Sequence, residues 1–266
     1  MMYGYGNMIS STNRLFSGGG GDYNPLTLAW ANNASESDTT ILDALNTFEQ
    51  VLIDNSLTAK TPAFYPMVGG TTDKCKRNFM NSTNGSAYEL GFVGGLTFAS
   101  TGVTPNGSTG YATTNYTSPN GDMGLFFYSR TDTAESVKCS IGAYSVDNAS
   151  QSVLFIEKTS SRFSANSETF GYVVENTVSS TGFFGVTRVS GDVTANWRGN
   201  ASTEARTLAN TQIPLNLFNR NKGASSDLYS TKECAGAGML VDYTPAELEI
   251  LRVAIDNFNT SLSRNV

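Results

Sequence analysis

Four glutamates fall in or beside stretches that alternate like β-strands: Glu157, Glu168, Glu175 and Glu204. Two carboxyl groups that face each other across neighbouring strands can cleave glycosidic bonds, one as acid and the other as base or nucleophile. Carboxylates on strands are far more often solvated surface groups. The sequence therefore predicts no catalytic residue, and we expect a protein that is not an enzyme.

Histidine and cysteine usage excludes several other chemistries. The chain contains no histidine, which removes Ser-His-Asp and Cys-His nucleophile activation and the commonest transition-metal ligand. Cys75, Cys139 and Cys234 are far apart and form no CxxC pair, so a zinc site would lack ligands. We interpret them as buried free thiols, with one disulfide and a spare thiol as the alternative. No cofactor and no metal are expected.

Loop residues offer a calcium site or a glycan site. Asp122 in "PNGDMG" and Asp192 in "VSGDV" are the carboxylates that a calcium ion could use, but an Asp after Gly is the ordinary residue of a hairpin turn. For a glycan or receptor, aromatic rings supply stacking and amides supply directed hydrogen bonds. The candidates are Trp197, Asn196, Tyr111 and Asp122, although Trp197 in an alternating strand fits a core position equally well.

Charge and hydropathy restrict the partners. The 266 residues contain 17 Lys and Arg against 23 Asp and Glu, a net charge of −6, and the basic residues are scattered. Nucleic-acid binding depends on grouped basic residues, so no nucleic acid is expected. No apolar run approaches the roughly 20 residues that span a bilayer, so no membrane insertion is expected.

The elements that would position these residues form four segments. Residues 1–24 are a Gly-rich arm, with Tyr3, Tyr5, Met8, Leu15 and Phe16 as apolar anchors, and residues 25–60 are a linker and an amphipathic helix. From 61 to 243, short strand-like runs alternate with turn signals such as Asn-Gly and Ser-Gly, without interleaved helices. This pattern predicts an antiparallel jelly-roll β-sandwich.

The closing segment, 244–266, predicts a second helix. Thr244 and Glu247 have the spacing of a capping box, and Pro245 suits the first turn. The stripe of Leu248, Leu251, Ile255, Phe258 and Leu262 spans barely two heptads, too short for a coiled coil. We therefore expect this helix to pack on the sandwich of its own chain.

Several stretches together carry a family resemblance. "FYPMVGGT", "TGVTPNGSTGYATTNY", "GLFFYSRT" and "YTPAELEILRVAIDNFNTSLSRNV" occur in that order from about residue 37 to the end of the chain. In this order they resemble bacteriophage virion appendage proteins of the tail-fibre and head-fibre type, whose bodies are concanavalin A-like (laminin-G-like) jelly-roll domains. The resemblance implies a β-sandwich with one helix before it and one after it, and a structural protein mounted on the capsid or tail.

The resemblance also sets the expected partners and the alternative. It implies a virion location, attachment to other virion proteins through the N-terminal arm, contact with a host surface glycan, and a homo-oligomer with a trimer favoured. The alternative is a carbohydrate-active enzyme or a glycan-binding module that acts on host surface polysaccharide. The Glu-x-Asp-x-x-Glu strand motif of the best-known jelly-roll glycoside hydrolases is absent from the sequence, which counts against the enzyme.

Overall fold

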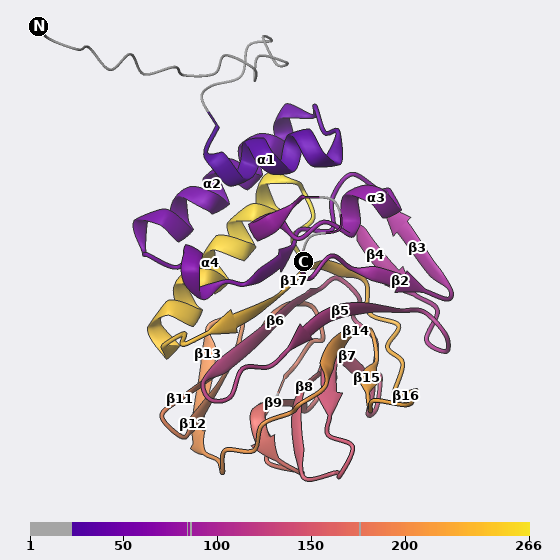
Figure 1. Cartoon of the computed structure of the whole chain (residues 1–266), viewed down its shortest axis with the longest axis vertical. Helices are drawn as coiled ribbons and strands as arrows, with labels where there is room; N and C mark the ends of the chain where they lie inside the picture. Colours follow the sequence, from indigo (N-terminus) through magenta and orange to yellow (C-terminus); the bar gives the residue numbers. More distant parts are fainter. Residues whose placement is uncertain (1–22, 84, 86, 176) are drawn as a thin grey trace, which may run out of the picture.

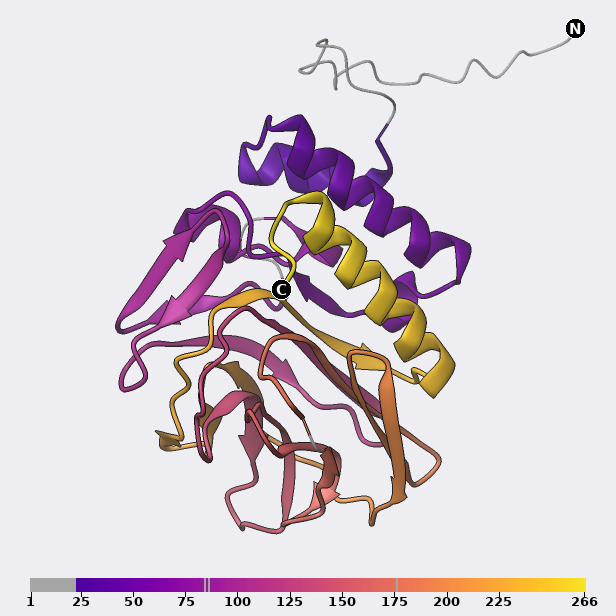
Figure 2. The same cartoon turned by 180° about the vertical axis from the view of Figure 1, so that it is seen from behind.

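Two β-sheets packed face to face make up most of the chain, with helices stacked on the outer face of one of them (Figures 1 and 2). The computed structural model describes residues 23–83, 85, 87–175 and 177–266. The strand pairs are antiparallel except for one short parallel contact. The predicted concanavalin A-like sandwich of antiparallel sheets is thus confirmed.

The sheet beneath the helices is called the covered sheet. Its long central strands are distant in sequence and pair residue for residue, for example Phe127 with both Phe184 and Ala237. Its spatial order is β13 (Asn200–Ala205), β12 (Asp192–Trp197), β11 (Gly182–Val189), β6 (Met123–Ser129), β17 (Cys234–Val241), β4 (Gly102–Pro105) and β3 (Leu96–Ala99), with β1 (Ala63–Tyr65) paired to β17.

The second sheet is called the open sheet, because the helices of the described chain lie on the other side of the sandwich (Figure 1). A short hairpin of two further strands lies beside its centre. The spatial order is β10 (Val173–Glu175), β9 (Ser161–Glu168), β8 (Ser150–Phe155), β7 (Cys139–Tyr144), β14 (Pro214–Leu217), β5 (Tyr111–Thr117) and β2 (Gly91–Val93), and the hairpin is β15 (Arg220–Asn221) and β16 (Ser226–Asp227).

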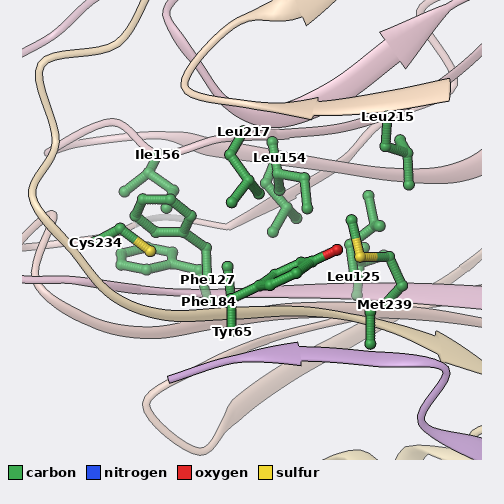
Figure 3. Close-up of a cluster of buried hydrophobic side chains, with 14 of the residues drawn as sticks. Tyr65, Leu125, Phe127, Leu154, Ile156, Phe184, Leu215, Leu217, Cys234 and Met239 are labelled. Carbon is green, nitrogen blue, oxygen red and sulfur yellow. The ribbon is translucent and has the colours of Figure 1, made fainter. Parts of the chain in front are cut away.

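The covered sheet separates two apolar cores. Successive side chains of a strand point to opposite faces, so Leu125 and Phe127 of β6 enter the space between the sheets (Figure 3). Phe126 and Tyr128 of the same strand enter the space beneath the helices. Both faces of β6 are therefore buried, which explains its continuous apolar run "MGLFFYS".

The helices that cover this sheet are α1 (Pro25–Ala34), α2 (Thr39–Asp54) and α4 (Pro245–Ser261), joined by the short helices α3 (Thr72–Cys75), η1 (Thr58–Lys60) and η2 (Phe79–Asn81). Helix α4 lies between α2 and β11 (Figure 2). The capping box at its start is formed: Thr244 Oγ1 accepts from the N–H of Glu247 at 3.2 Å, and Glu247 Oε2 accepts from the N–H of Thr244 at 2.7 Å. The predicted stripe lies underneath, with Leu248, Leu251, Ile255 and Phe258 buried and Leu262 partly buried.

Residues 25–34 were expected to be part of a linker, and the structure corrects this to the helix α1. Its capping group comes from another helix, since the carboxylate of Glu49 on α2 accepts hydrogen bonds from the N–H of Leu26 at 2.9 Å and from the N–H and hydroxyl of Thr27 at 2.8 and 2.7 Å. A carboxylate also interacts favourably with a helix N-terminus. A cap supplied 22 residues away leaves no local sequence signal.

The three cysteines are free and buried, and they lie in two different parts of the fold. Cys139 belongs to a small apolar cluster on the outer face of the open sheet, together with Val153 and Phe155. Cys75 and Cys234 lie in the core between the sheets. Burial raises the pKa of the Cys75 thiol to about 12, so this side chain is a neutral core residue at physiological pH.

Candidate functional site

A hollow of about 390 Å³ lies on the outer face of the open sheet. Its floor comes from β5 and β14, which are neighbours in the sheet although they are about 100 residues apart in the chain. One side is formed by the β15–β16 hairpin, which lies beside β7 and β14 (Figure 1). The residues around the hollow are Tyr111, Thr113, Asn216, Asn221, Gly223, Ala224, Ser225, Ser226 and Tyr229, and none of them is charged.

One wall of the hollow is Tyr111, which is positioned by the loop before β5. In this loop the side-chain oxygen of Asn106 accepts hydrogen bonds from the N–H groups of Ser108, Thr109 and Gly110 at 2.9–3.0 Å. Gly110 is needed here, because a Cβ at this position would lie 2.1 Å from the carbonyl oxygen of Gly95. The hydrogen bonds of this loop therefore fix the position of Tyr111 at the start of β5.

A second aromatic residue at the edge of the hollow is Tyr229, whose ring packs edge-on against that of Tyr111, with ring centroids 6.2 Å apart. The residues that follow it are held by a single carboxylate. Glu135 accepts hydrogen bonds from the hydroxyl of Ser230 at 3.1 Å and from the N–H of Thr231 at 2.5 Å. Both tyrosine walls are thus fixed by contacts that lie outside the hollow.

The floor contains an amide with unused hydrogen-bonding capacity. Asn216 is 2% exposed, and its Nδ2 donates to Oδ1 of Asn219 at 2.9 Å. Oδ1 of Asn216 and Nδ2 of Asn219 are buried and have no hydrogen-bond partner in the described chain. Reversing both amides would only exchange the roles of the two residues, so each keeps one unsatisfied polar atom in either assignment. A buried polar group without a partner costs about 1–3 kcal/mol.

The charged groups next to the hollow are already paired. Arg220 donates from Nε and Nη2 to the two carboxylate oxygens of Asp227, both at 2.8 Å, and the hydrogen bond with Asp227 raises the pKa of Arg220. The same guanidinium lies 4.7 Å from the ring centroid of Tyr144 on β7. These contacts fasten the β15–β16 hairpin to the sheet and leave the hollow itself uncharged.

The predicted glycan residues are not brought together. Tyr111 lines the hollow, whereas Trp197 is 6% exposed and packs in the core against Phe184 with ring centroids 6.3 Å apart. Asn196 is buried and donates to Glu249 of α4 at 3.0 Å. Asp122 accepts from the N–H of Ser190 at 3.0 Å and so closes the turn between β11 and β12. Of the four, only Tyr111 lies where a sugar could stack on its ring.

The four glutamates that were considered as possible members of a catalytic pair have separate surroundings. Glu157 forms an ion pair with Arg162, and Glu204 forms one with Arg206. Glu168 and Glu175 each keep one buried carboxylate oxygen without a hydrogen bond in the described chain. Within the residues that the structure covers, no group of three or more His, Cys, Asp or Glu side chains is arranged to hold a metal ion, Asp122 and Asp192 included.

Two other predictions concern parts of the chain outside these sites. The predicted anchors Tyr3, Tyr5, Met8, Leu15 and Phe16 lie outside the described residues. Among the described residues, no helix is both long enough and apolar enough to cross a membrane.

Sequence reasoning missed Asn216, Asn219 and Tyr229. All three come from "PLNLFNRNKGASSDLYS", a stretch to which no strand was assigned. The available signal was the alternation of Leu215 and Leu217 around Asn216, which is typical of a strand with one apolar face. That signal covers only four residues, and the position of the strand between β5 and β7 follows from the tertiary structure.

Comparison with known proteins gives structural likeness only. No protein-family model matches the chain, and no curated protein matches it. A solved mutant of Trypanosoma rangeli sialidase displaying trans-sialidase activity superposes with a TM-score of 0.54 at 10% identity, covering 82% of this chain and 39% of the sialidase. A Bacillus licheniformis β-glucanase superposes with a TM-score of 0.39 at 12% identity, covering 68% of this chain and 97% of the glucanase.

The sialidase comparison overturns the expectation that the chain is not an enzyme, because the solved structure that shares its fold has an enzymatic activity. The likeness itself, at 10% identity, shows the fold alone, and the chain spans well under half of the sialidase. Neither solved structure is described as a phage or virion protein. The fold that the resemblance to virion appendage proteins implies is therefore supported, whereas the virion location that it implies gains no support.

Proposed function

We propose that this chain is a carbohydrate-directed protein that recognises an uncharged saccharide in the hollow lined by Tyr111, Tyr229 and Asn216. The observation that carries the proposal is the unsatisfied amide of Asn216 in the floor of a hollow that is edged by two tyrosine rings. A sugar hydroxyl can donate to an amide oxygen or accept from an amide N–H, so it can pair with the free amide atom of Asn216 in either assignment of that side chain.

The size and chemistry of the hollow support this class of ligand. Small-molecule sites occupy roughly 300–1,000 Å³ and combine apolar or aromatic walls with a few fixed polar groups, and this hollow has about 390 Å³. Tyr111 and Tyr229 provide aromatic surface, and Asn221, Ser225 and Ser226 provide polar edges. An anionic sugar would meet no cation among the lining residues, so the proposal specifies a neutral one.

The proposal assigns recognition to this hollow. Its described lining contains no carboxylate, and hydrolysis of a glycosidic bond ordinarily needs two. Any reaction of the bound glycan would therefore need residues that lie outside the hollow. The sandwich fold that the chain shares with a sialidase is compatible with a glycan-active protein, and it is the hollow that makes the proposal specific to this chain.

The test is an array of neutral and anionic glycans, followed by calorimetric titration of the best neutral ligand. Replacement of Asn216 by Ala and of Tyr229 by Ala should each weaken binding by about tenfold. Asn257→Ala, an exposed asparagine on α4, serves as the matched control and should bind like the wild type. Retention of anionic glycans alone, or equal binding by all variants, would contradict the proposal.

The virion setting is a separate proposal that rests only on the sequence resemblance. In it the protein is a capsid- or tail-mounted subunit, residues 1–24 bind other virion proteins, the bound saccharide belongs to the host surface, and the subunits form a homo-oligomer, a trimer being favoured. Deletion of residues 1–24 should then abolish incorporation into particles. Full incorporation of the truncated protein would refute the attachment role.

A further inference from the structure

A second hollow lies beyond the start of β14. It has a volume of about 600 Å³ and is formed by the turn between β7 and β8 and by the segment that leads into β14. The residues around it are Ser145, Val146, Asp147, Ala149, Ser150, Ala209, Asn210, Gln212 and Ile213. Nothing in the proposed recognition of a single sugar uses this space.

The second hollow adjoins the first. Gly223, at the edge of the first hollow, is so close to Val146, at the edge of the second, that a Cβ built on the glycine would lie 3.0 Å from Cγ2 of the valine. Asn221 in the first hollow donates to the carbonyl oxygen of Pro214 at 2.8 Å, and Pro214 directly follows Ile213 of the second. The two spaces therefore meet where Gly223 lies beside Val146 and where Asn221 contacts Pro214.

The boundary between the two hollows at Gly223 and Val146 is apolar. Gly223 has no side chain, and Val146 is 71% exposed. Gly223 has a φ of +79°, a conformation that favours glycine, so the absence of a side chain here follows from the turn itself. A chain-like ligand can pass over this point without displacing a bulky group.

The second hollow presents fixed polar groups. Asp147 accepts from the hydroxyl of Ser145 at 2.6 Å and from the N–H of Ala149 at 3.1 Å, and the hydrogen bond from Ser145 is the main reason that the pKa of Asp147 is lowered. Asn210 is fixed on both sides, because its side chain accepts from the N–H of Gly121 at 3.1 Å and its carbonyl accepts from Ser150 Oγ at 2.9 Å. Gln212 is exposed at the edge.

We propose that the two hollows are successive subsites for one uncharged oligosaccharide chain, which crosses from Asn216 and the tyrosine walls over Gly223 and Val146 to Asp147 and Gln212. The inference rests on the proposed function and extends it from a single sugar to a polymer. Sugar hydroxyls would donate to the carboxylate of Asp147, a strong acceptor. A chain of acidic sugars would be repelled by the same carboxylate.

The experiment uses the full-length protein and measures its affinity for gluco-, manno- and galacto-oligosaccharides of one to six sugar units. Affinity should rise by about tenfold or more between the shortest and the longest members of the series that binds. Gln212→Ala should weaken binding of the long members by several-fold and leave the short members unchanged, whereas Asn216→Ala should weaken both. Thermal unfolding of each variant confirms that it is folded.

The outcomes separate this inference from the proposed function. Affinity that is independent of length, or equal effects of Gln212→Ala on short and long members, would overturn the extended site while single-sugar recognition stands. Failure of every series to bind would overturn both. A length dependence that disappears in Gln212→Ala and persists in the Asn257→Ala control supports the two subsites.

Discussion

Nη1 of Arg264 donates a hydrogen bond of 2.8 Å to the carbonyl oxygen of Met67, 197 residues earlier in the chain. Its Nη2 also donates to the carbonyl oxygens of Pro66 at 3.2 Å and Ala235 at 2.9 Å. The guanidinium is buried, and burial lowers its pKa to about 10. One side chain thus joins the end of the chain to β17 and to the segment after β1.

Arg264→Met should destabilise the fold by roughly 2–4 kcal/mol, because three buried carbonyl groups lose their donors. Arg252→Met is the control, since Arg252 on α4 is a partly exposed arginine whose partners Glu249 and Asp256 lie on the same helix. Such local pairs contribute little, so this variant should lose less than about 1 kcal/mol. Urea unfolding monitored by circular dichroism compares the two, and equal losses would refute the role of Arg264.

Helix α4 provides a test of intramolecular packing. Leu251 is fully buried beneath the helix, whereas Val253, two residues later, is 41% exposed. Leu251→Asp should unfold or aggregate the protein, because an unpaired charge would enter an apolar core. Val253→Asp introduces the same residue into the same helix and should change stability by less than about 1 kcal/mol. Size-exclusion chromatography measures the oligomeric state of each variant, and thermal melts measure its stability. A soluble, folded Leu251→Asp monomer would show that the apolar stripe of α4 serves oligomerisation.

Buried tyrosines predict alkaline unfolding. Burial is the main cause that raises the pKa of Tyr65, Tyr116 and Tyr243. These phenols stay neutral in the folded state but ionise near pH 10 when the chain unfolds. Their contribution to stability is therefore complete below about pH 10 and is lost as the pH rises further, at up to about 1.4 kcal/mol per pH unit for each phenol.

Tyr243→Phe isolates one of these groups. The variant should lose less stability than the wild type between pH 9 and pH 11.5, since one phenol no longer titrates. Thr61→Val is the matched control: it removes the hydroxyl that lies 2.7 Å from the Tyr243 oxygen but keeps the phenol, so its alkaline slope should match the wild type. Urea titrations across this pH range measure both slopes, and identical slopes for Tyr243→Phe and the wild type would rule out this group.

Local patterns determined several elements of this protein. The capping box of Thr244 and Glu247 and the apolar stripe that follows predict α4 within a few residues, because both signals lie within one helix. Alternating and apolar runs likewise predict most strands of the sandwich. Several strands escaped, and the two longest of them are β9, "SRFSANSE", which is mostly polar, and β17, "CAGAGMLV", which consists largely of small residues. Both are buried by their neighbours in the sheets, which local composition does not reveal.

Tertiary structure alone decided the site. The sequence offered Trp197 and Tyr111 as aromatic candidates and left a core position open for Trp197. The alternation of β12 directs Trp197 into the core, while Tyr111 lines a hollow on the outer face of the open sheet. The partners of Tyr111 became its neighbours when β14 paired between β5 and β7, which placed Asn216 opposite both Thr113 and Gly142. Short-range spacing specifies which face of a strand is apolar, but pairing between distant strands specifies which side chains meet, and that pairing has no local code.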